Sequence, residues 1–193
     1  MRQRKRKASV DGTAAGRANK FSDCDGGLRE GPKCGMNSVD MSELRIEPAT
    51  LDDLSELTEL LMDLFAQEED FTPNRENQLR GLRLILEQPS RGRIFVVRNS
   101  HKIVGMINLL ITISTAEGGF VLLLEDLVIH SEHRGQGLGS RLLKYAIDFA
   151  RQKKFLRITL LTDRPSDSRK FYLKHGFAES GMVPMRMYLS NDG

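Results

Sequence analysis

The chain has 193 residues, of which 39% are hydrophobic, so it has room for one core of ordinary size. Residues 1–40 hold nine Lys/Arg and five Asp/Glu, whereas the remaining residues hold 20 and 21, so the alkaline pI of 8.9 comes from the first forty residues. A nearly neutral folded part argues against a nucleic-acid surface, and the longest apolar runs are too short to span a bilayer. We therefore expect a cytoplasmic protein without a nucleic-acid or membrane partner.

Residues 1–41 are expected to be a disordered basic extension. They are rich in glycine and polar residues, and they lack the apolar periodicity needed to offset the entropy of ordering. The basic run Arg2–Lys7 is interpreted as solvated charge rather than as a nucleic-acid arm. Cys24 and Cys34 have neither histidine nor further cysteine partners nearby, so they do not predict a zinc site. Met41 is a candidate for the true start, which would leave 1–40 as an added extension.

Residues 42–193 are predicted to form one domain of alternating strands and helices. Leucines recur at helical spacing from Leu54 to Leu64 and again from Leu79 to Leu86, which indicates two helices. The predicted elements are, in chain order, a strand at 44–47, these two helices, strands at 93–98, 102–114 and 120–129, a helix after Gly139, a strand at 157–161, a helix at 165–174 and a final strand at 183–189. This order predicts an α/β (α+β) fold with a mixed, mostly antiparallel sheet flanked by helices on both faces.

The most informative segment is Arg134-Gly-Gln-Gly-Leu-Gly139, which lies between an apolar strand and a helix. Such a turn directs free backbone N–H groups and the positive end of the helix dipole to one point, which is typical of a phosphate or pyrophosphate site. Glycine is needed where a Cβ would block the ligand or forbid the backbone angles. A Rossmann loop is a poor match, because antiparallel strands precede this one and no third glycine stands at the required offset, and no Lys-Ser/Thr follows as in a P-loop.

Two blocks, Leu124–Leu143 and Phe171–Phe177, resemble the acetyl-CoA-binding core and the downstream motif of the GNAT superfamily of N-acetyltransferases. The resemblance covers residues 43–190, and the Glu125-Asp126 pair is similar to that of the diamine and polyamine acetyltransferases. It implies that 42–193 is an N-acetyltransferase domain with a splayed central pair of parallel strands. It also implies acetyl-CoA as the co-substrate.

The resemblance also implies roles for particular residues. Glu125 is expected to be the general base, with Asp126 on the opposite face of the strand, and Tyr172 is expected to be the acid that protonates the CoA sulfur. Pro165 stands where the family often has asparagine. The expected cofactor-binding residues are the strand backbone of Leu127, Val128 and Ile129, the supporting Arg134, the amides of Gly135, Gln136, Gly137, Leu138, Gly139 and Ser140, and the small Ser168.

The predicted reaction is direct acetyl transfer to a primary amine in a ternary complex. The acidic run Gln67–Phe71 favours a cationic acceptor, which could be a small molecule or a protein amine. A catalytically silent acyl-CoA-binding sensor or interaction module remains an alternative because of Pro165, and so does an O-acyl or longer-acyl transferase. The histidines show no metal-ligand spacing, so no metal is expected. Similar proteins commonly dimerise, which leaves a homodimer open.

Overall fold

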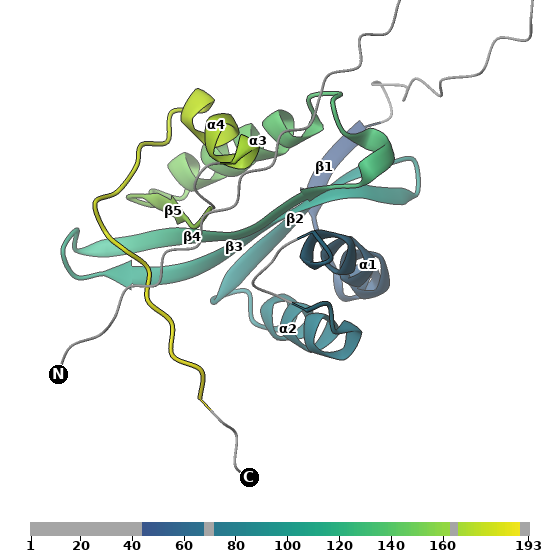
Figure 1. Ribbon diagram of the computed structural model, residues 1–193, viewed down its shortest axis with the longest axis horizontal. Coiled ribbons are helices and arrows are strands. Elements are labelled where there is room, and N and C mark those ends of the chain that lie inside the picture. The colour runs from purple at the N-terminus through teal and green to yellow at the C-terminus, as the bar shows by residue number, and fades with distance from the viewer. Residues whose placement is uncertain (1–43, 68–71, 163–165, 190–193) are drawn as a thin grey trace, which may run out of the picture. The chain divides into compact units, whose positions relative to one another are not determined.

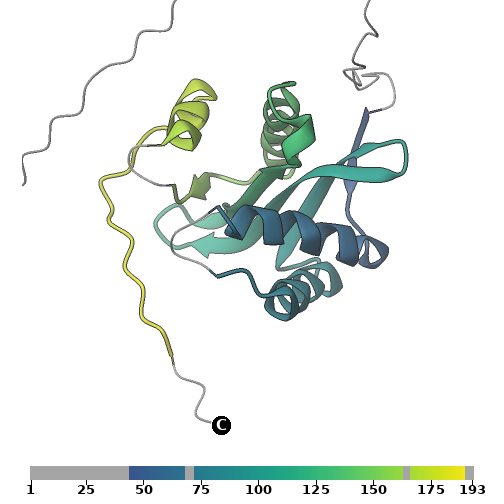
Figure 2. The same ribbon diagram turned by 45° about the vertical axis from the view of Figure 1, so that its right-hand side comes forward.

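A computed structural model of the chain describes residues 44–67, 72–162 and 166–189. These residues form a sheet with helices on both faces (Figure 1, Figure 2). The predicted extension at 1–41, the acidic residues 68–71 and Pro165 lie outside the described residues. The elements are β1 (Leu44–Pro48), η1 (Leu51–Asp53), α1 (Leu54–Phe65), α2 (Arg75–Glu87), β2 (Gly92–Asn99), β3 (Lys102–Ser114), β4 (Gly119–Ile129), η2 (Ser131–His133), α3 (Leu138–Gln152), β5 (Ile158–Leu160) and α4 (Asp167–Lys174).

The five strands lie in their chain order, β1-β2-β3-β4-β5. Successive strands from β1 to β4 pair antiparallel, and β4 and β5 pair parallel because α3 crosses between them. The predicted mixed, mostly antiparallel sheet is therefore confirmed. In the described part of the chain, no helix is both long and apolar enough to cross a membrane.

The sheet has a hydrophobic core on each face. On one face, α3 buries Leu142, Leu143 and Ala146 against residues of β2, β3 and β4. On the other face, α1 and α2 cover a second core that includes Leu57 and Leu82. These apolar side chains lie at the helical spacing predicted from the sequence. The spacing places them on one face of each helix, and burial of that face holds the helix on the sheet.

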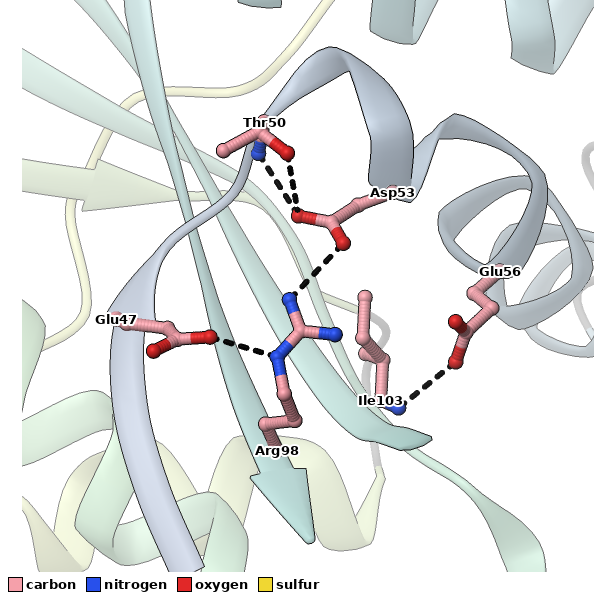
Figure 3. A network of polar contacts seen from close by, with 6 residues as sticks. All are labelled: Glu47, Thr50, Asp53, Glu56, Arg98 and Ile103. Carbon is pink, nitrogen blue, oxygen red and sulfur yellow. Dashed lines mark hydrogen bonds and ion pairs between the residues drawn. The ribbon is translucent and has the colours of Figure 1, made fainter. Parts of the chain in front are cut away.

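A polar network fixes the start of α1 to the edge of the sheet (Figure 3). The Arg98 guanidinium on β2 donates to Glu47 on β1 at 2.6 Å and to Asp53 in η1 at 2.9 Å. The same Asp53 carboxylate accepts the backbone N–H of Thr50 at 2.8 Å, and the Glu56 carboxylate accepts the N–H of Ile103 at 2.8 Å. The first helix is therefore attached to two strands at its N-terminal end.

The central strands separate beyond Leu124. The β4–β5 ladder covers only Leu122–Leu124 on β4 and ends at the pair Leu124–Leu160. Within the described residues, β4 therefore runs on from Glu125 to Ile129 without a β5 neighbour. This opening is called the splay below. It leaves the β5-facing edge of β4 open, while the opposite edge of β4 still pairs with β3.

The predicted strand at 183–189 is wrong. These residues form no strand in the structure, and the side chains of Met182, Val183, Met185, Met187, Tyr188 and Leu189 are 77–96% exposed. The apolar residues after the turn at Gly181 favoured a strand, but a strand also needs a neighbour to supply hydrogen bonds. Pro184 has no N–H to donate to such a ladder.

Candidate active site

The segment from Arg134 to Gly139, called the glycine loop below, connects η2 to α3. Gly135 and Gly137 have φ angles of 75° and 77°, a left-handed conformation that side chains other than glycine rarely adopt. A Cβ at either position would meet no heavy atom within 4 Å, so the space beside both glycines is open. The backbone N–H of Arg141 donates to the carbonyl oxygen of Gly137 at 3.1 Å. The backbone N–H groups just before it belong to the first turn of the helix and have no acceptor within the helix. An open loop at a helix start suits an anionic group.

Gly139 has a different environment from the other two glycines. A Cβ there would lie 3.8 Å from side-chain atoms of Ile129 on β4 and of Phe171 on α4. The start of α3 therefore approaches both the end of β4 and the helix that carries Tyr172.

Arg134 links the glycine loop to its neighbours. Its Nε donates to the carbonyl oxygen of Ile129 at 3.0 Å, and its guanidinium donates to the side chain of Gln67, just after α1, at 3.0 Å. A hollow of about 300 Å³ lies there, lined by Asp63, Ala66, Gln67, Ser131 and Arg134. Arg134 thus stabilises the turn from β4 into the loop and joins it to the α1 side.

The three predicted pantetheine-binding residues lie in the splay. Val128 is buried in the core beneath α1 and α2, and Leu127 and Ile129 pack against the core on the α3 face. Their side chains are thus directed to the two faces of the sheet, and the strand edge is left to the backbone. An extended ligand with amide groups can pair with such an edge as an added strand.

The two acidic residues of β4 have different environments. The β3–β4 register shifts here: Asn108 pairs with Asp126 and Leu109 with Leu124, so Glu125 is the extra residue of a β-bulge. Glu125 is exposed, whereas Asp126 is buried and accepts a hydrogen bond from Asn108 Nδ2 at 2.9 Å. The bulge was not predicted, although a polar amide within the apolar run 103–111 was a visible signal.

Tyr172 lies on α4 among aromatic side chains. Its ring makes edge-to-face contacts with Phe171 and Phe177, at centroid distances of 5.2 and 5.6 Å. Burial raises the pKa of Tyr172 to about 12, and the nearby charge of Asp126 contributes to the rise. The phenol therefore keeps its proton through the neutral range and remains a hydrogen donor.

The N-terminal end of α4 contains Ser168, which is exposed. Ser166 caps this helix, accepting the N–H of Arg169 with its hydroxyl oxygen at 3.0 Å. The helix predicted at 165–174 is confirmed over 167–174.

A basic hollow begins at the end of the glycine loop. It has a volume of about 380 Å³ and is lined by Ser140, Arg141, Lys144, Ile147, Asp148, Arg151 and His175. Its cationic groups lie on α3, with Arg141 and Lys144 within two turns of the loop amides and Arg151 more than three turns beyond them. None of them was predicted as a site residue, although their spacing along the helix was visible.

Three possible metal ligands lie close together at η2 and its N-cap residue. Ligand atoms of His130, Glu132 and His133 are all within 4.8 Å of one another. The spacing of the histidines along the sequence did not predict this cluster. The local turn already uses part of this group, because His130 Nδ1 accepts the N–H of Glu132 at 3.4 Å.

Comparison with known proteins gives the family. A profile of the acetyltransferase (GNAT) family matches residues 54–177, which is more than half of the chain. The aminoalkylphosphonate N-acetyltransferase of Salmonella typhimurium (strain LT2) is 28% identical over 141 residues, covering 72% of this chain and 88% of that protein.

Two solved structures share the fold. One is a possible acetyltransferase from Clostridium difficile 630, with a TM-score of 0.71 and 17% identity over 77% of this chain and 99% of that one. The other is an aminoglycoside acetyltransferase from an uncultured soil metagenomic sample, with a TM-score of 0.62 and 21% identity over 77% and 98%. The chain therefore belongs to the acetyltransferase (GNAT) family and is an acetyl-CoA:amine N-acetyltransferase.

Proposed function

We propose that this protein transfers the acetyl group of acetyl-CoA directly to a small primary amine while both substrates are bound. The observation that carries the proposal is the arrangement of the splay between an open glycine loop and Tyr172. Loop amides can hold a diphosphate, the free edge of β4 can hold the pantetheine arm, and the thioester is then delivered toward α4.

The basic hollow on α3 supports the same orientation of the cofactor. Arg141 and Lys144 contribute positive charge close to the loop and Arg151 adds charge at the far end of the hollow, where the remaining phosphate of coenzyme A could find a partner. These side chains are proposed to increase affinity for the nucleotide end and to take no part in the chemical step.

The reaction requires two proton transfers. An alkylammonium with a pKa near ~10.4 must lose a proton before its nitrogen can attack the thioester carbonyl. Glu125 is proposed as the base that accepts it through a water, and its exposed side chain can pass the proton on to solvent. The C–N bond forms, the C–S bond breaks and the nitrogen passes its second proton to solvent. Tyr172 is proposed to protonate the departing sulfur, and the phenolate then regains a proton from water.

The acceptor class is proposed from the relatives. The matched Salmonella protein is named for aminoalkylphosphonates, and the solved soil enzyme for aminoglycosides, which are likewise small molecules with primary amines. A further relative from Oryza sativa subsp. japonica, 35% identical over 71 residues, is named a probable glucosamine 6-phosphate N-acetyltransferase. Small amines are therefore the first class to test.

The test is release of free CoA thiol from acetyl-CoA with a panel of amines: 2-aminoethylphosphonate, glucosamine 6-phosphate, 1,4-diaminobutane and a lysine-containing peptide. The expected result is saturable turnover with at least one small amine and acetylation of its nitrogen by mass spectrometry. Coenzyme A binding without turnover of any amine would instead favour the silent sensor that Pro165 suggested in the sequence.

A further inference from the structure

Asn108 and Asp126 form a buried polar pair within an otherwise apolar part of the sheet. Their side chains are only 3% and 7% exposed, and they lie directly opposite each other on β3 and β4. Asn108 Nδ2 donates to Asp126 Oδ2 at 2.9 Å. Buried polar groups are unfavourable unless their hydrogen bonds are satisfied, so a pair in such a place calls for a physical reason.

The hydrogen bond fixes the orientation of the Asn108 amide. Because the NH₂ group of Asn108 donates to Asp126, its carbonyl oxygen faces elsewhere. That oxygen, Asn108 Oδ1, is buried and has no hydrogen-bond partner in the part of the chain that the structure describes. It is therefore a buried acceptor to which no described residue donates.

The pair lies at the mouth of the splay. Asp126 comes two residues after Leu124, the last β4 residue that pairs with β5. Asn108 and Asp126 share the alternation of Met106 and Val128, which are buried in the core beneath α1 and α2. The pair therefore belongs to the sheet face opposite α3, while the glycine loop leads into α3 itself.

The pair is also within electrostatic reach of the proposed acid. The charge of Asp126 acts on Tyr172, although burial of the phenol is the larger cause of its raised pKa. A nitrogen bound at the pair would thus be near the group that is proposed to protonate the sulfur. An amine and a thioester have to meet at such a position for direct transfer.

We propose that Asn108 Oδ1 and the Asp126 carboxylate together bind the ammonium group of the acceptor at the splay. This proposal rests on the proposed acetyl transfer and names the residues that recognise its amine. A primary ammonium has three N–H donors and a positive charge, which match a neutral acceptor and a carboxylate on one side. An alcohol of the same length lacks the charge and offers one donor, so the site selects amines.

The experiment is steady-state kinetics on the full chain with the best amine of the panel above. Asn108→Leu keeps the branching of the side chain and removes both Oδ1 and the Nδ2 that donates to Asp126, and Asp126→Asn removes the charge but can still hydrogen-bond Asn108. Thr58→Val is the matched control, because Thr58 is a buried polar residue whose hydroxyl is satisfied within α1 by the Leu54 carbonyl at 2.6 Å. Thermal unfolding is measured for each variant, and Asp126→Asn serves alone if Asn108→Leu folds poorly.

We expect the KM for the amine to rise about tenfold or more in both site variants, as expected for loss of a charge-assisted hydrogen bond. The KM for acetyl-CoA should change less than about twofold, and Thr58→Val should behave as wild type. An amine KM within about twofold of wild type in a folded Asp126→Asn enzyme overturns the proposal, whatever happens to kcat. If the wild-type protein acetylates no amine of the panel, it is the proposed function that fails.

Discussion

At the scale of single residues, the environment of Tyr172 keeps its phenol protonated. Its ring is enclosed by Phe171 and Phe177, and both burial and the charge of Asp126 disfavour the phenolate. The hydroxyl therefore stays protonated through the neutral range and can donate a proton, as the role proposed for it demands.

Replacement of Tyr172 by phenylalanine tests this role. Tyr172→Phe should lower kcat about 10²-fold, since a positioned proton donor contributes that order of acceleration, while coenzyme A affinity in calorimetry changes little. Tyr145→Phe is the control, because Tyr145 lies on α3 and makes an edge-to-face contact with Phe95 at a centroid distance of 5.0 Å. A Tyr172→Phe enzyme with wild-type kcat would remove the assignment.

The pKa of Tyr172 can be measured directly. The absorbance of phenolate is followed during alkaline titration of the wild type and of Tyr172→Phe, and the difference curve reports Tyr172 alone. We expect its midpoint at about 12, because burial stabilises the neutral phenol over the anion. A midpoint at the ordinary tyrosine value of about 10 would show that the phenol is not held in this environment.

At the scale of elements, the site is assembled from a strand that loses its neighbour and a helix that begins immediately afterwards. The β4–β5 ladder stops at Leu124, and α3 begins at Leu138 with the glycine loop before it. The splay supplies an unpaired strand edge and the loop supplies unpaired helix amides. One extended ligand with amides at one end and a diphosphate at the other can satisfy both.

A valine in the glycine loop should separate folding from cofactor binding. Gly137→Val places a side chain in the open space of the loop at a φ of 77°, so coenzyme A binding should be lost. Gly118→Val is a matched control: Gly118 lies between β3 and β4, has a φ of 70° and is equally open. Both variants should lose about 1–2 kcal/mol of unfolding free energy from backbone strain. Full coenzyme A affinity in Gly137→Val would argue against the loop as the diphosphate site.

At the scale of the whole molecule, two hydrophobic cores on opposite faces hold the central strands in place, and the network in Figure 3 joins the first helix to the sheet. Burial alone would raise the pKa of Asp53, but hydrogen bonds from the Thr50 N–H and from Arg98 outweigh it, and the net pKa is lowered. The ionised carboxylate is thus the form that the fold stabilises.

The pH dependence of unfolding tests this network. Because the folded-state pKa of Asp53 lies below 3.8, its contribution is present above that pH and is lost as the pH falls through the lower value. Asp53→Asn should cost about 1–3 kcal/mol at pH 7 and should make unfolding less sensitive to pH below about 4. Asp52→Asn, at the exposed neighbouring position, should cost less than about 1 kcal/mol. Urea unfolding at pH 7 and pH 3 measures both, and equal losses in the two variants would refute the role of Asp53.

The features that the sequence predicted correctly depend on short-range patterns. Helix faces such as Leu54–Leu61 follow from spacing along one element, and the glycine loop follows from adjacent residues. The pairing of Asn108 with Asp126 depends on a bulge, and a bulge is set by how two distant strands fit together. The final strand failed for a similar reason: the apolar residues in 183–189 give no information about a pairing partner.

The most direct test of the account is calorimetric titration of the folded protein with coenzyme A and, separately, with pantetheine, which has the same arm but no diphosphate. If amides of the glycine loop hold the diphosphate, coenzyme A should bind with one site per chain and pantetheine should bind at least a hundredfold more weakly. Equal affinity for the two ligands, or no heat of binding with coenzyme A, would contradict it.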